Sequence, residues 1–394
     1  MLGKIFLLIY IIIQTLISFL TERLIRRNKH YGEMGRKTRV VRLALYILLA
    51  LLPVFGAFLP KCGFKYFCMK YGNIWLAFFM YYSGFMLFTA LIMLIIAKVR
   101  KDPEKRWLGY TFTIAAVLTV IVTSYGLIHA QRPKTVNYEI SVNKQTEGVK
   151  SLRVVLIADL HLSVNSNLSL TEKMVEKVNA AEPDVVVVAG DIFTSNFEGL
   201  KDPDKYAAAL SKMKAKYGVY AVYGNHDVDE DLFSGFAISP STEAFRTPEI
   251  EQFFKDAGFT ILYDETVPLA DGEVTLVGRI DGEKAGDGTK NRKDASALLS
   301  DVDKTKPVIV LQHEPIEFSD LSKNGADVVL CGHTHNGQVF PGNLFIPIFN
   351  ENGYGVKEID GMQTIVTAGV GYYGPPIRVG TDSEVTVVDI QFEE

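Results

Sequence analysis

Residues 328–338 read VVLCGHTHNGQ and end an apolar run with two histidines. Val328 to Leu330 are typical of a short buried strand, which we expect to end at Gly332. His333 and His335 follow, one residue apart. In an extended segment, residues i and i+2 point to the same side, so the two imidazoles could bind a metal ion at the end of this strand. Cys331 is interpreted as a small buried residue of the strand.

Several other apolar runs of the C-terminal half also end in polar, metal-capable residues. Amphipathic stretches at 170–181 and 204–216 predict helices between them, and further β-rich runs lie at 274–278, 364–367 and 384–390. This alternation predicts a layered α/β domain, in which the carboxyl ends of the strands gather ligands at one edge. The runs and the residues that end them are 152–158 with Asp159 and His161, 185–189 with Gly190 and Asp191, 218–223 with Gly224 to Asp227, and 308–312 with His313.

The residue types at these strand ends indicate the kind of metal. They are carboxylates, imidazoles and one amide, with no cluster of thiolates, which favours Mn²⁺, Fe or Zn²⁺ over a cysteine-bound structural zinc. Seven ligands exceed the coordination of one tetrahedral ion, so we expect two divalent ions that share a carboxylate. Such a pair is suited to in-line displacement at phosphorus by an activated hydroxide. The predicted ligands are Asp159, His161, Asp191, Asn225, His313, His333 and His335.

The ordered motifs DxH, GD, GNHD, a lone strand-end His and GHxH resemble those of the calcineurin-like metallophosphoesterases over residues 150–394. The resemblance implies a two-sheet αββα sandwich. It implies one metal held by Asp159, His161, Asp191 and His335, and a second held by Asp191, Asn225, His313 and His333, with Asp191 bridging. His226 corresponds to the general acid that protonates the leaving oxygen, Asp227 would orient it, and Asn225 would also contact the substrate phosphate.

Two longer motifs, GHTHNGQ and GYYGPPIRVG, are similar to the membrane-associated bacterial branch of that family, where GHTHGGQ is common. This branch includes enzymes that cleave the pyrophosphate of lipid-linked sugar nucleotides. Arg378, in the second motif, could bind phosphate or lie on the surface. Arg279, Asp281 and Arg292 could line a substrate cleft, and residues 229–245 could form a mobile loop that sets specificity or could pack locally.

Residues 1–130 carry four apolar segments, at about 5–20, 43–59, 74–97 and 108–128. A membrane-spanning helix needs about 20 apolar residues, and about 17 suffice. We therefore predict a four-helix transmembrane region, a linker and edge strand at 131–150, and the catalytic domain at 151–394. The alternatives are core helices of a soluble domain and, for the first segment, a cleaved signal peptide. The predicted spans contain no charged residue, which favours an anchor over a transport pathway.

Basic residues predict the orientation of these segments. The connections after the first and third segments are rich in Lys and Arg, whereas residues 60–73 contain three lysines, so we expect the first two on the cytoplasmic side of a plasma membrane and the catalytic domain outside. Trp75 and Trp107 are predicted interface anchors. Cys62 and Cys68 fall in the predicted outer connection, where either a disulfide or two free thiols would fit.

Composition excludes other classes of protein. A formal net charge of −4 argues against general nucleic-acid binding, and three cysteines are too few for a disulfide framework. The sequence predicts a membrane-anchored binuclear phosphoesterase that cleaves a phosphodiester, phosphomonoester or pyrophosphate, with a phosphorylated lipid head group or an envelope precursor as candidate substrates. The competing hypothesis is a membrane receptor or scaffold that binds metal or phosphate without turnover, although binding alone needs no proton donor such as His226. The oligomeric state stays open.

Overall fold

A computed structural model describes residues 2–27, 35–101, 106–195, 197, 199–238, 245–284, 286 and 292–393. The chain separates into two compact units. The first comprises residues 1–128 with the short segments 231–239 and 374–377, and the second comprises the remaining residues from His129 onward. The two short segments interrupt the contiguous division near residue 130 that the sequence predicts.

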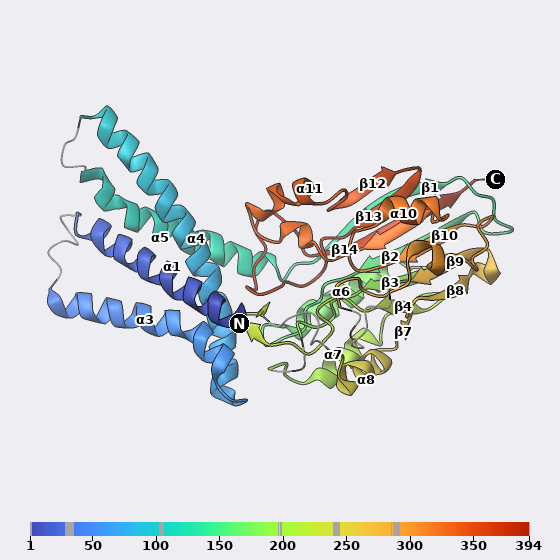
Figure 1. Ribbon diagram of the computed structural model, residues 1–394, viewed down its shortest axis with the longest axis horizontal. Coiled ribbons are helices and arrows are strands. Elements are labelled where there is room, and N and C mark those ends of the chain that lie inside the picture. The colour runs from blue at the N-terminus through green and yellow to red at the C-terminus, as the bar shows by residue number, and fades with distance from the viewer. Residues whose placement is uncertain are drawn as a thin grey trace. The chain divides into compact units, whose positions relative to one another are not determined.

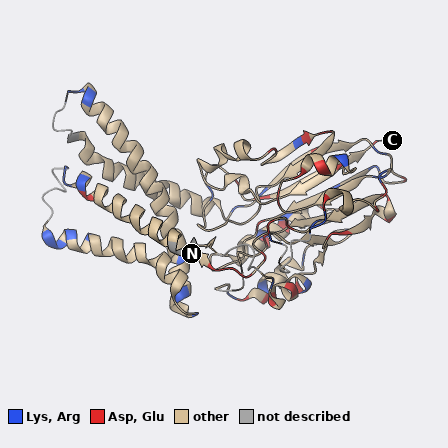
Figure 2. Ribbon diagram, viewed as in Figure 1, with Lys and Arg blue, Asp and Glu red and all other residues tan. Residues whose placement is uncertain are grey.

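The first unit is built from four long apolar helices, each long enough to cross a membrane (Figure 1). They are α1 (Leu2–Ile25), α3 (Arg36–Phe58), α4 (Gly63–Val99) and α5 (Thr111–His129), the last preceded by a 3-10 turn, η1 (Arg106–Tyr110). Lys and Arg gather toward helix ends, while long stretches of each helix carry no charge (Figure 2). The prediction of four apolar N-terminal helices is confirmed.

The expected connection at 60–73 is wrong in extent, because α4 begins at Gly63 and runs for 37 residues. The thiol of Cys62 caps this helix by accepting a hydrogen bond from the Lys65 amide at 3.5 Å. Cys68 is buried inside the helix, and both thiols are free. Trp75 is also buried within α4 and is not an anchor at its start. The residues at 64–73 carry no pattern that marks a helix start, so the sequence predicts the beginning of α4 too late.

A small hairpin belongs to the first unit although it follows the GNHD turn in sequence. Strands β5 (Leu232–Phe233) and β6 (Phe236–Ala237) pair antiparallel. The rings of Tyr10 and Phe233 meet edge to face with centroids 5.4 Å apart. Of the loop predicted at 229–245, residues 239–244 lie outside the described residues, and its predicted mobility stays a prediction.

The second unit contains two six-stranded sheets. The first sheet has the order β1 (Lys134–Val142), β14 (Glu384–Phe392), β2 (Ser151–Ile157), β3 (Val185–Ala189), β4 (Val219–Val222) and β7 (Thr260–Ile261). In it, β2, β3, β4 and β7 run parallel, and β14 and β1 run antiparallel to them.

The second sheet has the order β12 (Gly355–Ile359), β13 (Met362–Val366), β11 (Val328–Cys331), β10 (Val308–Leu311), β9 (Val274–Gly278) and β8 (Glu265–Leu269). In it, β9, β10, β11 and β13 run parallel, flanked by antiparallel β8 and β12.

Alternating side chains of these strands build three apolar layers. Val154 and Leu156 of β2 pack with Ile309 and Leu311 of β10 in the layer between the sheets. Side chains of the opposite parity pack under α6 (Leu168–Ala180), α7 (Pro203–Leu210) and α8 (Pro248–Asp256) on one outer face, and under α9 (Ala295–Leu298) and α10 (Phe318–Lys323) on the other. The two-sheet sandwich with outer helices (Figure 1) confirms the predicted fold class.

The limits of α6 and α7 differ from those that the sequence predicts. Asn167 caps α6, which begins at Leu168, by accepting a hydrogen bond from the Ser169 amide at 3.1 Å. Helix α7 ends at Leu210 instead of 216. Strand β1 lies at the edge of its sheet, as predicted for residues 131–150.

Candidate metal centre

The turns that follow the parallel strands carry the predicted ligands, and several of these turns adopt left-handed backbone conformations. Asp159, His161, Asp191, His333 and His335 have φ of 55°, 47°, 53°, 76° and 51°. Such values are uncommon for residues other than glycine and concentrate at functional sites. The backbone therefore turns at each strand end and directs the side chain toward a shared centre.

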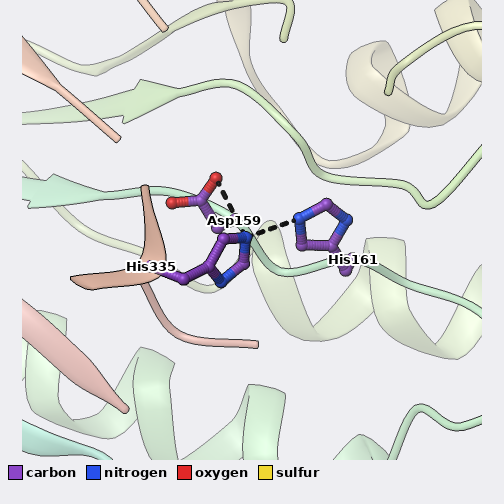
Figure 3. Close-up of side chains that lie close together, drawn as sticks. All are labelled: Asp159, His161 and His335. Carbon is purple, nitrogen blue, oxygen red and sulfur yellow. Dashed lines mark hydrogen bonds and ion pairs between the residues drawn. The ribbon is translucent and has the colours of Figure 1, made fainter. Parts of the chain in front are cut away.

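The first group of ligands is Asp159, His161 and His335, all buried (Figure 3). The Nε2 atoms of His161 and His335 lie 2.9 Å apart, and Nε2 of His335 lies 3.8 Å from a carboxylate oxygen of Asp159. Atoms that could each donate a lone pair thus face one another across a small space, as ligands of one cation do.

The second group surrounds His313. Its Nε2 atom lies 3.0 Å from Oδ1 of Asn225, 3.2 Å from Oδ2 of Asp191 and 3.2 Å from Nδ1 of His333. The same Asp191 oxygen lies 3.5 Å from Nε2 of His161, in the first group. Asp191 is therefore close to members of both groups, which is the position that a bridging carboxylate requires.

The two histidines of the opening motif do not lie on an extended strand. Strand β11 ends at Cys331, and His335 begins a 3-10 turn, η4 (His335–Gly337). His333 contacts His313, whereas His335 contacts His161. The prediction of an extended segment is wrong, because His333 and His335 have left-handed backbones. The two imidazoles contact different ligand groups, in agreement with the predicted ligand sets.

The second ring nitrogens of two ligands fix how these imidazoles are oriented. Nδ1 of His313 lies 2.7 Å from the carbonyl oxygen of Ala189, and Nδ1 of His161 lies 3.0 Å from the Thr194 hydroxyl. A carbonyl can only accept, so Nδ1 of His313 carries a proton, and Nε2 is the atom that faces the other candidate ligands. This arrangement of a ligand with an outer hydrogen-bond partner is typical of metal-binding histidines. The residues present fit a divalent metal centre.

Burial sets the charge of these groups. It lowers the pKa of His161 and of His333 to about 3, so both rings are neutral at pH 7, the state that can bind a cation. Burial alone would raise the pKa of Asp191, but the imidazoles of His313 and His226 outweigh it and hold that pKa well below its usual range. Burial alone would lower the pKa of His313, but Asp191 outweighs it and holds that pKa well above its usual range, so these two groups form a charged pair.

His226 lies beside the first group and is held from behind by a carboxylate. Its ring centroid is 5.7 Å from that of His161 and 4.4 Å from that of Tyr373, on which it stacks. Nδ1 of His226 lies 3.1 Å from Oε2 of Glu230. The other oxygen of Glu230 forms an ion pair with Lys284, and the side chains of both residues are buried.

The expected contact between Asp227 and His226 is absent, because Asp227 has other partners. Its carboxylate accepts hydrogen bonds from the amides of Asp191, Phe193 and Gly224, each at 2.9 Å. These bonds fix the GNHD turn against the turn after β3. Asp227 therefore shapes the backbone around Asp191. The carboxylate that contacts His226 belongs to Glu230.

Arg378 is not positioned to bind substrate. Its side chain is fully buried, and the guanidinium donates to the carbonyl oxygens of Ala368 at 2.7 Å, Gly371 at 2.6 Å and Asp382 at 2.6 Å. The amide of Gly371 in turn donates to the Asp159 carbonyl at 2.7 Å. Arg378 therefore holds the turn that supports Asp159, and its predicted role with phosphate is wrong.

Arg279, Asp281 and Arg292 lie on the side of the site formed by β9 and β10. Arg279 is buried and donates to Glu317 at 2.6 Å, and Arg292 lies 3.3 Å from the Gln312 amide oxygen. Asp281 is buried, and burial raises its pKa. It accepts from the amides of Glu283 and Lys284 at 2.9 and 2.8 Å, and so positions the turn that supplies Lys284.

Comparison with known proteins gives the family of this site. The family model of the calcineurin-like phosphoesterases matches residues 152–337, the stretch that contains all seven predicted ligands and His226. Residues 152–337 form a calcineurin-like phosphoesterase domain. The predicted family is thereby confirmed. The number of ions and the roles of single residues stay predictions.

Relatives of this metallophosphoesterase include membrane proteins. A zebrafish transmembrane protein with a metallophosphoesterase domain is 31% identical over 69% of this chain and 61% of its own length. An uncharacterized metallophosphoesterase of Campylobacter jejuni is 24% identical over 95% of this chain and 94% of its own. One of Aquifex aeolicus is 27% identical over 70% of this chain and 98% of its own. The chain thus spans less than two thirds of the zebrafish relative.

The sequence predicts the candidate ligands but not the residues behind them. Glu230 lies in the acidic run DVDED, where no spacing singles out one carboxylate. Lys284, Glu283 and Thr194 follow other strands, and only the folded chain brings them to the site. Glu283 accepts a hydrogen bond from the Asn225 amide at 3.0 Å.

Proposed function

We propose that this protein is a membrane-anchored phosphoesterase with two divalent metal ions and His226 as its general acid. The observation that carries the proposal is that Asp159, His161 and His335 form one buried ligand group and Asp159, Asp191 and His313 form another, with His226 beside them. Divalent ions bound there would supply Lewis acidity toward phosphoryl oxygens and would activate water for attack on phosphorus. Mn²⁺, Fe and Zn²⁺ all suit the ligand types.

The protein's own residues would do the remaining work. Asp159, His161 and His335 would hold one ion, and Asn225, His313 and His333 the other, with Asp191 between them. His226 would give a proton to the leaving oxygen, and Glu230 would keep the ring turned so that Nε2 faces the substrate. Because Nδ1 of His226 is the atom near Glu230, Nε2 is the atom left for proton transfer.

The buried Glu230–Lys284 pair supports an enzyme over a receptor or scaffold. Burying a carboxylate and an ammonium costs free energy, which only a good geometry offsets. A protein that only bound metal would not need a carboxylate beside His226, because this carboxylate is not a predicted metal ligand. A catalyst would need it, since the anion stabilises the imidazolium that forms when His226 takes up a proton.

The membrane helices support the proposal of a substrate close to a bilayer. Four candidate spans precede the domain, and five residues after the last of them, at Lys134, the first strand begins. The domain is therefore tethered close to a bilayer. We propose a substrate that is held in or near that bilayer, such as a phosphorylated lipid head group or a lipid-linked envelope precursor, and a catalytic domain on the outer side of a plasma membrane.

A chromogenic phosphodiester assay tests the activity. The full-length protein in detergent with Mn²⁺ is compared with Asp191→Asn and His226→Ala. We expect Asp191→Asn to abolish turnover. His226→Ala should lower kcat by about 10²–10⁴-fold, the range for a lost general acid, on a substrate whose leaving group needs a proton, and much less on a nitrophenyl ester. Equal and negligible rates for all three proteins over diester, monoester and pyrophosphate substrates would favour the receptor or scaffold.

A further inference from the structure

An uncharged segment of the second unit exposes several large apolar side chains. Residues 340–350, between the metal-ligand turn and β12, read FPGNLFIPIFN. The exposed fractions are 50% for Phe340, 56% for Leu344, 51% for Phe345, 69% for Ile348 and 79% for Phe349. Single exposed apolar residues are ordinary, but five within ten positions form a patch of the kind that marks an interaction surface. We call residues 340–349 the apolar segment.

The backbone of the apolar segment is satisfied locally. It forms a 3-10 turn, η5 (Gly342–Leu344), and a short helix, α11 (Ile346–Phe349). The amides of Phe345 and Ile348 donate to the carbonyl oxygens of Gly342 and Phe345, both at 2.9 Å. Because these amides already have partners, this part of the segment can enter an apolar medium without the cost of desolvating unpaired backbone groups.

The apolar segment is anchored close to the point where the chain leaves its last membrane span. The Phe340 amide donates to the Val379 carbonyl at 2.7 Å. Three residues further along, Asp382 contacts Nε2 of His129 at 2.8 Å and Nζ of Lys134 at 2.9 Å. His129 is the last residue of α5, and Lys134 is the first of β1. Three residues extend over about 10 Å at most, so the segment starts near the membrane exit.

We propose that the apolar segment inserts into the bilayer interface and so holds the catalytic domain on the membrane surface. The occupant is lipid because the patch is aliphatic and aromatic without charge, and because its anchor at Val379 is three residues from Asp382, which contacts the last residue of α5. This surface is distinct from the metal centre, and the proposal does not depend on the catalytic activity.

Site-specific fluorescence in vesicles tests this proposal on the full-length protein. An environment-sensitive fluorophore is attached to Phe349→Cys in a Cys62→Ser background, since Cys68 and Cys331 are buried. The matched control carries the label at Lys323→Cys, whose side chain is 71% exposed on α10. The protein is reconstituted in phosphatidylcholine–phosphatidylglycerol vesicles with and without lipids that bear a quencher on the acyl chain. Thermal unfolding shows that both labelled proteins fold.

We expect the label at residue 349 to emit at shorter wavelength than the label at 323 and to lose at least half its intensity to the lipid quencher. Quenching by aqueous iodide should show the reverse order. Equal emission and equal iodide quenching at the two positions would overturn the proposal. A shifted emission at 349 that the lipid quencher leaves unchanged would also overturn it, because the residue would then be covered by protein.

Discussion

At the residue scale, Glu230 determines which nitrogen of His226 faces the centre. Its carboxylate contacts Nδ1 of the imidazole on one side and Lys284 on the other. Its backbone is fixed as well, since the Glu230 amide donates to the Ser195 hydroxyl at 2.8 Å and the carbonyl of Glu230 accepts from the same hydroxyl at 2.7 Å. A side chain held at both ends can keep His226 in a single orientation.

The change Glu230→Gln tests this positioning role. The amide preserves the shape but removes the charge that stabilises a protonated His226. We expect kcat to fall by about 10-fold or more for a phenyl ester, whose leaving group needs a proton, and much less for a 4-nitrophenyl ester, which leaves without one. KM should stay unchanged. The ratio of the two rates is the measurement, and Glu249→Gln, an exposed carboxylate on α8, is the control. Equal losses on both esters would indicate a structural role only.

Metal binding should stabilise the folded protein, because the ligands converge only after folding. At a Mn²⁺ concentration about 100 times its Kd, we expect about 2.7 kcal/mol of added stability, or a rise in Tm of about 5–10 °C. The measurement is the thermal unfolding of chelator-treated protein with and without Mn²⁺.

Two variants separate the ligands from their supports. His335→Ala should remove most of the shift, whereas Thr194→Val, which removes the partner of His161 Nδ1, should weaken binding by about 10–100-fold and leave part of it. A shift of the same size in the wild type and in His335→Ala would show that the ion binds elsewhere.

The sequence could predict the ligands one by one because each is a short motif at a strand end. It could not predict partners whose only signal is their position in space. The sequence predicts Asp227 as the partner of His226 because it is the next residue, yet its oxygens accept hydrogen bonds from three amides of neighbouring turns. Arg378 gave no signal of burial, since nothing in the sequence shows which carbonyl oxygens surround a glycine-rich loop.

At the scale of elements, the connection between β13 and β14 supports the metal centre by packing against the chain around Asp159. Gly369 and Gly371 approach the chain around Asp159 so closely that a Cβ at Gly371 would lie 2.0 Å from the Leu160 carbonyl oxygen. Arg378 fixes this turn, and Glu384 at the start of β14 accepts from the Ala368 amide at 2.8 Å. The turn is therefore rigid and leaves no room for a side chain at Gly371.

The change Arg378→Met should destabilise the domain by at least about 3 kcal/mol, because buried carbonyl oxygens lose their donor. A matched control is Arg153→Ala, which removes an exposed ion pair between β2 and β14, with a distance of 2.7 Å to Asp389. The control should cost about 0–1 kcal/mol. Chemical unfolding followed by far-ultraviolet circular dichroism gives the free energy of unfolding of both variants. A cost for Arg378→Met as small as that of the control would contradict the structural role.

Strand cores were predictable at this scale, and helix limits were not. Val185–Ala189, Val274–Gly278 and Val328–Cys331 match their predicted ranges because β-branched runs bounded by Gly or Asp leave little choice. Helix α4 is longer than predicted because aromatic residues and isolated lysines at 64–73 lower the apolar average without ending the helix. The short strands at 232–237 and 260–261 have too few residues to form a recognisable pattern.

At the scale of the whole molecule, the chain consists of a membrane unit and a catalytic unit joined by continuous chain. The division near residue 130 follows from the change in composition and was predictable. The assignment of residues 231–239 and 374–377 to the membrane unit was not, since it rests on contacts between segments more than 200 residues apart. Both segments directly adjoin residues that support the site, Glu230 on one side and Arg378 on the other.

The orientation of the catalytic domain is the last prediction. Most basic residues of 1–130 lie in the connections that follow α1 and precede α5 or at the adjoining helix ends. Glu22 near the end of α1 pairs with Arg26 and with Arg42 of α3. Basic connections face the cytoplasm, so the domain after α5 should lie outside. In intact cells that produce a Cys62→Ser background, a membrane-impermeant maleimide should label Lys323→Cys on α10 and should leave Lys37→Cys, at the start of α3, unlabelled until the membrane is permeabilised. The reverse order would place the catalytic site in the cytoplasm and would exclude envelope precursors that are exposed only on the outer surface.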